Sequence, residues 1–159
     1  MRFTAQEEYG LRCILQLARH ENNGPLTIDE IAKNEALTTH YVGKLMRILL
    51  KGGLIKSTRG QNGGYMLAQP AVQTSVLDIL NILDGPFFEL GMCSKFTGID
   101  IVCVNTTECS VRALWSTINS SVNQILGTTM LKNLIVDEKT ANKWFRYIAK
   151  PSIPVSARP

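Results

Sequence analysis

Closely spaced helix-start signals in the first third of the chain constrain its fold more than any other feature. Thr4-x-x-Glu7 and Thr27-x-x-Glu30 are capping boxes, in which the side chains of the first and last residues each accept a backbone N–H of the other. Thr38 is a further capping residue, and Gly52-Gly53 ends the helix that follows it. The short helix, tight turn and longer helix defined in this way predict a helix-turn-helix.

The helix that begins after Thr4 is apolar on two sides. One apolar stripe consists of Leu11, Ile14, Leu15 and Ala18, and the opposite stripe consists of Tyr9, Cys13 and Leu17. A helix with two apolar sides packs on two sides, so we expect Cys13 to be a small core residue. Glu8 and Arg12 share the remaining polar face, where the ordinary interpretation is a surface ion pair at i,i+4.

A hairpin is predicted after the helix-turn-helix. Residues 54–58 and 65–68 are predicted strands, and the Gly- and Asn-rich segment 59–64 is the turn between them. A hairpin that directly follows a recognition helix is a wing, and Arg59 and Gln61 would lie at its tip. The plain alternative is an ordinary surface hairpin.

The distribution of charge indicates a polyanionic partner. The formal net charge of +4 alone says little. Between residues 36 and 77, however, there is no Asp or Glu, whereas five basic residues precede or form the hairpin: Lys44, Arg47, Lys51, Lys56 and Arg59. A basic stripe without opposing acids favours nucleic acid, although a solvated basic surface has the same composition.

Several classes of protein are not expected. No run of about 18 apolar residues occurs, and the first residues lack an apolar signal segment, so we expect a cytoplasmic protein without a membrane partner. The chain has only two histidines, no phosphate-binding loop and no nucleophile motif, so we do not expect an enzyme.

Three of the four cysteines lie in one long segment without clear periodicity. Cys93, Cys103 and Cys109 are spaced C-x9-C-x5-C. In the cytoplasm clustered cysteines bind metal or carry out redox chemistry more often than they form structural disulfides. The paired C-x2–4-C spacing that zinc prefers is absent. An iron–sulfur cluster, a thiol/disulfide switch and plain loop residues therefore remain as interpretations.

A heptad-like apolar seam follows the cysteines. It consists of Val111, Trp115, Ile118, Val122 and Ile125, on a predicted helix of about four turns. This seam fits either an intramolecular core helix or a dimer interface, and a DNA-binding protein favours the dimer because two-fold symmetric sites call for one. Residues 128–134 are predicted to continue as a short helix.

We therefore expect a mainly α fold with a small β-wing. The predicted division is a winged helix-turn-helix DNA-binding domain over 1–84, a cysteine-rich loop over 85–109, a dimerisation helix over 110–135 and a partly disordered C-terminal extension over 136–159.

Several motifs carry a family resemblance. They are the opening Met-Arg-Phe-Thr, Gly24-Pro25-Leu26-Thr27-Ile28-x-x-Ile31-Ala32, Tyr41-x-x-x-Leu45, the wing Arg59-Gly60-x-x-Gly63-Gly64-Tyr65, and Val76-x-Asp78-Ile79. Together with the cysteines they resemble, over about residues 1–135, the Rrf-type family of bacterial winged-helix regulators, in particular its iron–sulfur sensing branch of IscR-, NsrR- and RirA-like members. The resemblance implies a homodimer with one [2Fe–2S] or [4Fe–4S] cluster per subunit.

The resemblance also implies roles for individual residues. Cys93, Cys103 and Cys109 match the cluster ligands. The His that is the fourth ligand in IscR-like members is Arg112 here, and a protonated arginine cannot ligate iron. NsrR-like members use a carboxylate from the other subunit, and Glu8 occupies that position. The residues placed at DNA are Thr38, Thr39, His40, Tyr41, Lys44, Arg47, Arg59 and Gln61.

The expected function is that of a DNA-binding transcriptional regulator, a repressor more readily than an activator. Its binding to a double-stranded operator would respond to redox state, nitric oxide or iron and cluster supply through the cluster. A cluster-free regulator switched by thiol/disulfide chemistry is the first alternative. A protein-interaction module is the second, in which the apolar seam binds a partner and the basic stripe is incidental.

Overall fold

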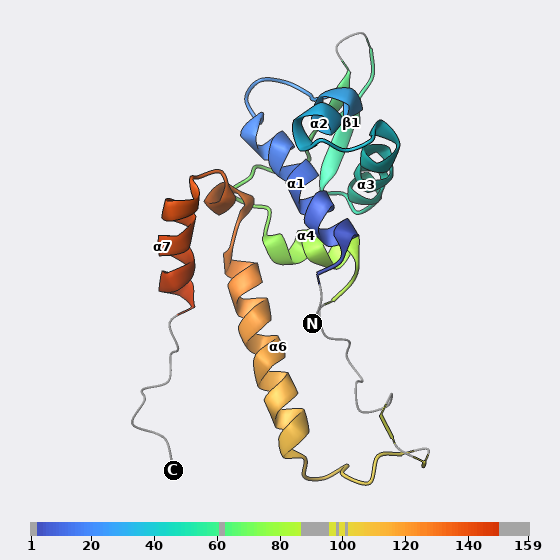
Figure 1. Cartoon of the computed structure of the whole chain (residues 1–159), viewed down its shortest axis with the longest axis vertical. Coiled ribbons are helices and arrows are strands. Elements are labelled where there is room, and N and C mark those ends of the chain that lie inside the picture. The colour runs from blue at the N-terminus through green and yellow to red at the C-terminus, as the bar shows by residue number, and fades with distance from the viewer. Residues whose placement is uncertain (1–2, 61–62, 87–95, 98, 101, 150–159) are drawn as a thin grey trace.

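The structure is a computed structural model that describes residues 3–60, 63–86, 96–97, 99–100 and 102–149. Figure 1 shows its elements. They are α1 (Ala5–Arg19), α2 (Ile28–Glu35), α3 (Thr39–Lys51), β1 (Ile55–Thr58), β2 (Gly64–Leu67), α4 (Val76–Leu83), α6 (Ser110–Thr128), the 3₁₀ turn η1 (Leu131–Leu134) and α7 (Glu138–Ile148). The predicted fold class, mainly helical with a two-stranded wing, is confirmed.

The predicted caps set the starts of the first three helices. In the first capping box the Glu7 N–H donates to Thr4 Oγ1 at 3.1 Å, and the Thr4 N–H donates to Glu7 Oε2 at 2.7 Å. Thr27 and Glu30 form the same pair of bonds at the start of α2. The Tyr41 N–H donates to Thr38 Oγ1 at 3.2 Å, so Thr38 caps α3. The helix-turn-helix is therefore encoded by local hydrogen bonds.

The core lies where α1 crosses α3 and α4. Its fully buried side chains come from these three helices and from α2, and they include Ile14, Ile31, Leu45, Met46, Leu49 and Ile79. Cys13 belongs to this core with no exposed surface, as predicted, and burial raises the pKa of its thiol to about 12. Gly10 permits the close approach of α1 to α4, because a Cβ at this position would lie 2.4 Å from Leu83 Cδ2.

The hairpin is fixed to the helix-turn-helix by backbone hydrogen bonds. β1 and β2 pair antiparallel, with Ile55 opposite Leu67 and Thr58 opposite Gly64. Beyond this register, Leu26 before α2 forms a β-bridge with Tyr65. The bridge attaches the wing to the segment that enters α2.

The C-terminal end of α6 is attached to the same body, and the rest of the helix projects from it (Figure 1). Val76 N–H donates to Thr129 O at 2.8 Å, and Leu131 N–H donates to Thr74 O at 2.9 Å. Leu131 is completely buried, whereas no residue of α6 itself is buried. With 19 residues, α6 is longer than the expected four turns. Only the 3₁₀ turn η1 forms within the predicted short helix at 128–134.

No helix within the described ranges is long and apolar enough to cross a membrane.

Candidate functional site

The predicted DNA-reading residues lie together at the first turns of α3. Thr38 and Thr39 are exposed, Tyr41 is half-buried, and the exposed side chains that complete the surface are His40, Lys44 and Arg47. The first turn of α3 contains no acidic residue. This end of the helix therefore presents hydroxyl, aromatic and cationic groups without a competing negative charge, as a surface that reads base edges between phosphates requires.

The hairpin that forms the wing carries a further predicted DNA-contacting cation. Arg59 is exposed directly after β1, and Gln61 lies outside the described residues. Gly63 and Gly64, which follow in the hairpin, are required for steric reasons. A Cβ at Gly63 would lie 2.5 Å from Thr58 O, and one at Gly64 would lie 2.5 Å from Leu26 O. The Gly-Gly-Tyr motif therefore packs the wing against the body.

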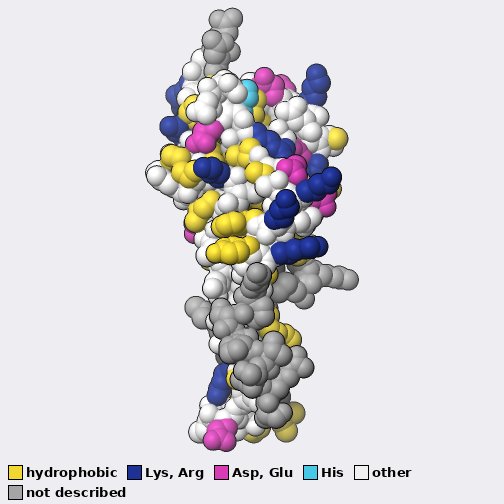
Figure 2. All heavy atoms as spheres, turned by 90° about the vertical axis from the view of Figure 1, so that its left-hand side faces the viewer, with side chains coloured by type: hydrophobic (Ala, Val, Ile, Leu, Met, Phe, Trp, Pro, Cys, Tyr) yellow, Lys and Arg dark blue, Asp and Glu magenta, His cyan; other side chains and the backbone are white. Residues whose placement is uncertain are grey.

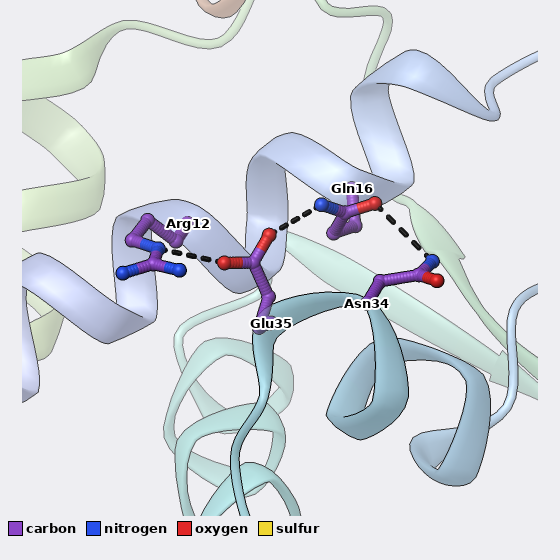
Figure 3. Close-up of polar contacts among 4 residues, drawn as sticks. All are labelled: Arg12, Gln16, Asn34 and Glu35. Atoms are coloured by element: carbon purple, nitrogen blue, oxygen red, sulfur yellow. Dashed lines mark hydrogen bonds and ion pairs between the residues drawn. The ribbon is translucent and has the colours of Figure 1, made fainter.

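A buried carboxylate lies at the end of α2, behind the recognition helix. Glu35 is the last residue of α2 and is 9% exposed. Its Oε2 accepts from Arg12 Nε at 2.6 Å, and its Oε1 accepts from the Gln16 side-chain amide (Figure 3). The hydrogen bond with Glu35 is the main reason that the pKa of Arg12 is raised.

The surface pair expected between Glu8 and Arg12 is therefore replaced by a more buried one. Among the described residues the ion pair is Arg12–Glu35, and Glu8 remains exposed on α1. The two paired residues are 23 positions apart, and no helical periodicity connects residues at such a separation. Sequence reasoning missed Glu35 for that reason.

An aromatic contact continues from this pair to the recognition helix. The Arg12 guanidinium carbon lies 5.5 Å from the centroid of the Tyr9 ring. The Tyr9 ring in turn meets the Tyr41 ring edge to face, with 6.0 Å between centroids and an interplanar angle of 84°. Tyr9 on α1 thus connects a buried ion pair to the Tyr41 side chain near the start of α3.

Two of the three predicted cysteine ligands lie within the described residues, and Cys93 does not. Cys103 and Cys109 are half-buried free thiols. Cys109 is the N-cap of α6, where its Sγ accepts the Arg112 N–H at 3.3 Å. The Arg112 guanidinium donates to the carbonyls of Thr106 and Thr107 at 3.2 and 3.4 Å. Arg112 therefore holds the end of the cysteine loop against the start of α6.

The donor types fit an iron–sulfur cluster, but the described residues of one chain do not bring these donors together. Unbridged thiols are the ligands that cluster iron prefers. In the described part of the chain, no three His, Cys, Asp or Glu residues lie close enough to hold a metal ion. Glu8 is on α1, whereas the Cys109 end of α6 points away from that body (Figure 1). A site with both donors needs a second chain.

Among the described residues, the predicted seam on α6 is exposed at its projecting end and half-buried at its attached end. Val111 is 58% exposed and Trp115 is 40% exposed, at the end of α6 that projects from the body. Ile118, Val122 and Ile125, nearer the attached end, are half-buried. The projecting half of α6 therefore carries apolar surface that is available to another chain.

A shallow apolar pocket of about 200 Å³ lies where α7 meets the body. Its lining includes Leu11, Leu80, Leu126 and Phe145, with Glu8 also at its wall. Figure 2 looks onto the side of the molecule that carries α7 and shows hydrophobic side chains beside a group of Lys and Arg side chains. The α7 residues Lys139, Lys143 and Arg146 are exposed.

Comparisons with known proteins agree with this geometry. A family model named Rrf2 and described as an iron-dependent transcriptional regulator matches residues 3–137. Protein rrf2 of Nitratidesulfovibrio vulgaris is 30% identical over 90% of this chain and 93% of its own length. The structure of CymR, the global cysteine regulator of B. subtilis, superposes with a TM-score of 0.70 at 29% identity, over 86% of this chain and 99% of CymR. T. potens IscR superposes with a TM-score of 0.67 at 25% identity, over 85% and 86% of the two chains.

Proposed function

Because this chain belongs to the Rrf2 family of transcriptional regulators, we propose that it is a dimeric repressor whose operator binding is controlled by an iron–sulfur cluster. Members of this family are DNA-binding transcriptional regulators and not enzymes. The cluster, the dimer, the sign of regulation and action in the cytoplasm are our proposals. The observation that supports the cluster is that two free thiols, those of Cys103 and Cys109, lie at the free end of α6.

DNA recognition would use α3 and the wing together. In a two-fold dimer the two α3 helices would enter successive major grooves about 34–36 Å apart. Lys44 and Arg47 would contact phosphates, which position the protein and make binding salt-dependent. Thr38, Thr39 and Tyr41 would reach base edges, and Arg59 would enter a narrow minor groove and read its shape.

The dimer is supported by the uncovered seam of α6. Val111 and Trp115 expose apolar surface at the projecting end of α6, and the described residues of one chain do not cover it. Pairing of two α6 helices would bury this surface and would bring the cysteine loop of one protomer toward the α1 helix of its partner. Glu8 of one chain would then be a donor for the thiols of the other.

The cluster would be held by Cys93, Cys103 and Cys109, with Glu8 as the fourth donor. A cluster supplies iron that exchanges electrons or reacts with nitric oxide and oxidants. Glu8 is a harder and weaker ligand for such iron than a thiolate, which makes its bond the one most easily displaced. Arg112 does not bind iron in this proposal, because it holds the loop carbonyls of Thr106 and Thr107.

Anaerobic purification with iron and sulfide analysis tests this proposal. The wild-type protein should contain iron and acid-labile sulfide, and Cys109→Ser should lose both. Glu8→Ala should lose part of the cluster or change its absorption spectrum, whereas Glu21→Ala, which alters another acid of the same body, should not. Cluster content and spectrum that are unchanged in Glu8→Ala would remove Glu8 from the ligand set.

The second candidate is a cluster-free regulator switched by cysteine oxidation. It is favoured by the similarity to Staphylococcus aureus CymR, which is known in an oxidized form, and by the unbridged thiols in the described part of the loop. If the anaerobic protein holds no iron, and oxidation links two loop cysteines while changing retention of specific DNA against competitor DNA, this candidate replaces the cluster.

A further inference from the structure

A continuous set of contacts leads from a buried carboxylate to the recognition helix. It begins at Glu35 at the end of α2, passes to Arg12 and Tyr9 on α1, and ends at Tyr41 on α3. Figure 3 shows its first part, with Glu35 between Arg12 and Gln16, and Gln16 in contact with Asn34. Three helices of the helix-turn-helix body are thus joined through side chains behind the surface assigned to DNA.

Glu35 is the fixed end of this set. Its side chain is 7% exposed, and a carboxylate at that depth requires charged or hydrogen-bonding partners. Both of its oxygens have one, Arg12 Nε on one side and the Gln16 amide on the other. The Arg12 side chain is 44% exposed, so its guanidinium is held by the carboxylate and not by surrounding packing.

Arg12 links Glu35 to the Tyr9 ring. A guanidinium is planar and can form a hydrogen bond at Nε while its carbon lies over an aromatic face. Arg12 has both contacts, at 2.6 Å to Glu35 Oε2 and 5.5 Å to the Tyr9 centroid. The half-buried Tyr9 ring therefore contacts both a cation and the Tyr41 ring.

Tyr41 is the member of the set that lies at the DNA-facing end of α3. Its backbone N–H is bound to the Thr38 cap, and its half-buried ring packs against the core. A tyrosine on this turn would otherwise choose between rotamers, and each rotamer would place the hydroxyl at a different base edge. The edge-to-face contact with Tyr9 selects one orientation of the ring.

We propose that Tyr9, held by Arg12 and Glu35, is a positioning residue for DNA recognition that sets the orientation of Tyr41 and so contributes to base selectivity without touching DNA. This inference rests on the proposed DNA-binding function. It predicts that selectivity depends on the ring at position 9 and not on the Tyr9 hydroxyl, since the contact with Tyr41 is between rings.

The DNA used to test this inference is obtained by selection from a random pool of double-stranded sequences. The full-length wild-type protein enriches sequences, and the affinity for the enriched duplex is then compared with that for a scrambled duplex of the same length. Tyr9→Leu should lower the affinity for the enriched duplex roughly 2- to 10-fold, while affinity for the scrambled duplex and the salt dependence stay unchanged. Tyr9→Phe should retain wild-type selectivity, and Arg12→Lys should give an intermediate loss, because lysine keeps the charge but not the planar guanidinium.

Leu15→Ala is the matched control, since Leu15 is also a half-buried residue of α1 packed on the core. It should lower thermal stability without changing the ratio of the two affinities. The inference is overturned if Tyr9→Leu keeps the wild-type ratio, if Tyr9→Phe loses it, or if Leu15→Ala lowers it as much as Tyr9→Leu does. If the wild-type protein enriches no sequence at all, the DNA-binding function fails first, and this inference fails with it.

Discussion

Leu26 and Tyr65 exchange both of their backbone hydrogen bonds, with Tyr65 N–H donating to Leu26 O at 2.7 Å and Leu26 N–H donating to Tyr65 O at 2.9 Å. This pair fixes the orientation of the wing relative to the helix-turn-helix. The neighbouring Gly64 is necessary for it, because any side chain there would strike the Leu26 carbonyl.

Gly64→Ala should therefore destabilise the protein by about 1–3 kcal/mol, the usual range for a side chain forced into a packed site. Urea unfolding followed by circular dichroism measures it. Gly43→Ala is the control, since a Cβ at Gly43 would meet only Ile28 Cδ1, at an ordinary 3.7 Å. Alanine favours a helix over glycine, so this substitution should raise the free energy of unfolding by about 0.5–1 kcal/mol. Equal effects of the two substitutions would contradict the steric role of Gly64.

Arg59→Ala should weaken binding to the operator and reduce discrimination between sequences. The loss of one phosphate or minor-groove contact should lower the slope of log affinity against log salt by about 1. Lys56→Ala on β1, which removes the same charge from an exposed strand position, should leave discrimination intact. Gel-shift titrations at several salt concentrations decide, and wild-type affinity in Arg59→Ala would exclude the wing from DNA.

Cys13 should be inert in the folded protein. Burial raises the pKa of its thiol to about 12 and leaves it no exposed surface, and alkylation requires the thiolate. After treatment of the native apoprotein with iodoacetamide at pH 8, peptide mass spectrometry should find Cys103 and Cys109 modified and Cys13 unmodified. Unfolding in urea should expose Cys13. Modification of Cys13 as fast as Cys103 in the native protein would contradict its place in the core.

Leu131→Ala should destabilise the protein by about 2–5 kcal/mol, because it empties a fully buried site. Leu131 is in η1, so this loss should also loosen the attachment of α6. Val136→Ala, at a position 41% exposed, should change the free energy of unfolding by no more than about 0.5 kcal/mol. Chemical denaturation monitored by circular dichroism compares the two, and a similar small effect of both would place Leu131 outside the core.

The start of α7 should become less stable in acid, because its N-cap residue Asp137 is a carboxylate. Thr140 donates to the Asp137 carboxylate through its hydroxyl at 2.6 Å and its N–H at 3.0 Å, and these bonds lower the pKa of Asp137. A lowered folded-state pKa gives stabilisation that is present above the unfolded pKa of about 3.9 and is lost as pH falls through the folded pKa.

Fluorescence of Trp144 in a Trp115→Phe background follows this change. Asp137→Asn retains a capping side chain but does not titrate, so it should remove the part of the acid transition that belongs to α7. An identical acid profile in both proteins would mean that this cap does not control the helix.

The features that the sequence predicted well are those written in neighbouring residues. The caps at Thr4, Thr27 and Thr38 and the strands of the wing depend on contacts a few positions apart, and the burial of Cys13 follows from helical periodicity. The features that it could not predict join distant segments. The Arg12–Glu35 pair and the return of Leu131 to Thr74 depend on how helices cross, which no local pattern encodes.

The candidate site divides in the same way. The sequence predicted that Thr38 to Arg47 lie at the start of and along one helix, and α3 has this arrangement. Their contact with DNA stays a prediction. The ligand role of Glu8 stays a prediction, since its proposed partners belong to another chain. The capping role of Cys109 and the loop contacts of Arg112 depend on backbone carbonyls and amides that a sequence does not position.

The attachment of α6 at one end makes it a lever. Its 19 residues span about 28 Å at 1.5 Å per residue, between Cys109 at the free end and Thr129 at the hinge. A rotation of roughly 2° at the hinge sweeps the free end through about 1 Å by the same geometry. Metal–thiolate bonds tolerate little displacement. In the proposed regulator, a change in the orientation of the body on its operator would therefore displace Cys109 relative to the other proposed ligands. Since linkage is reciprocal, operator DNA should itself alter how tightly the cysteine loop holds what it binds.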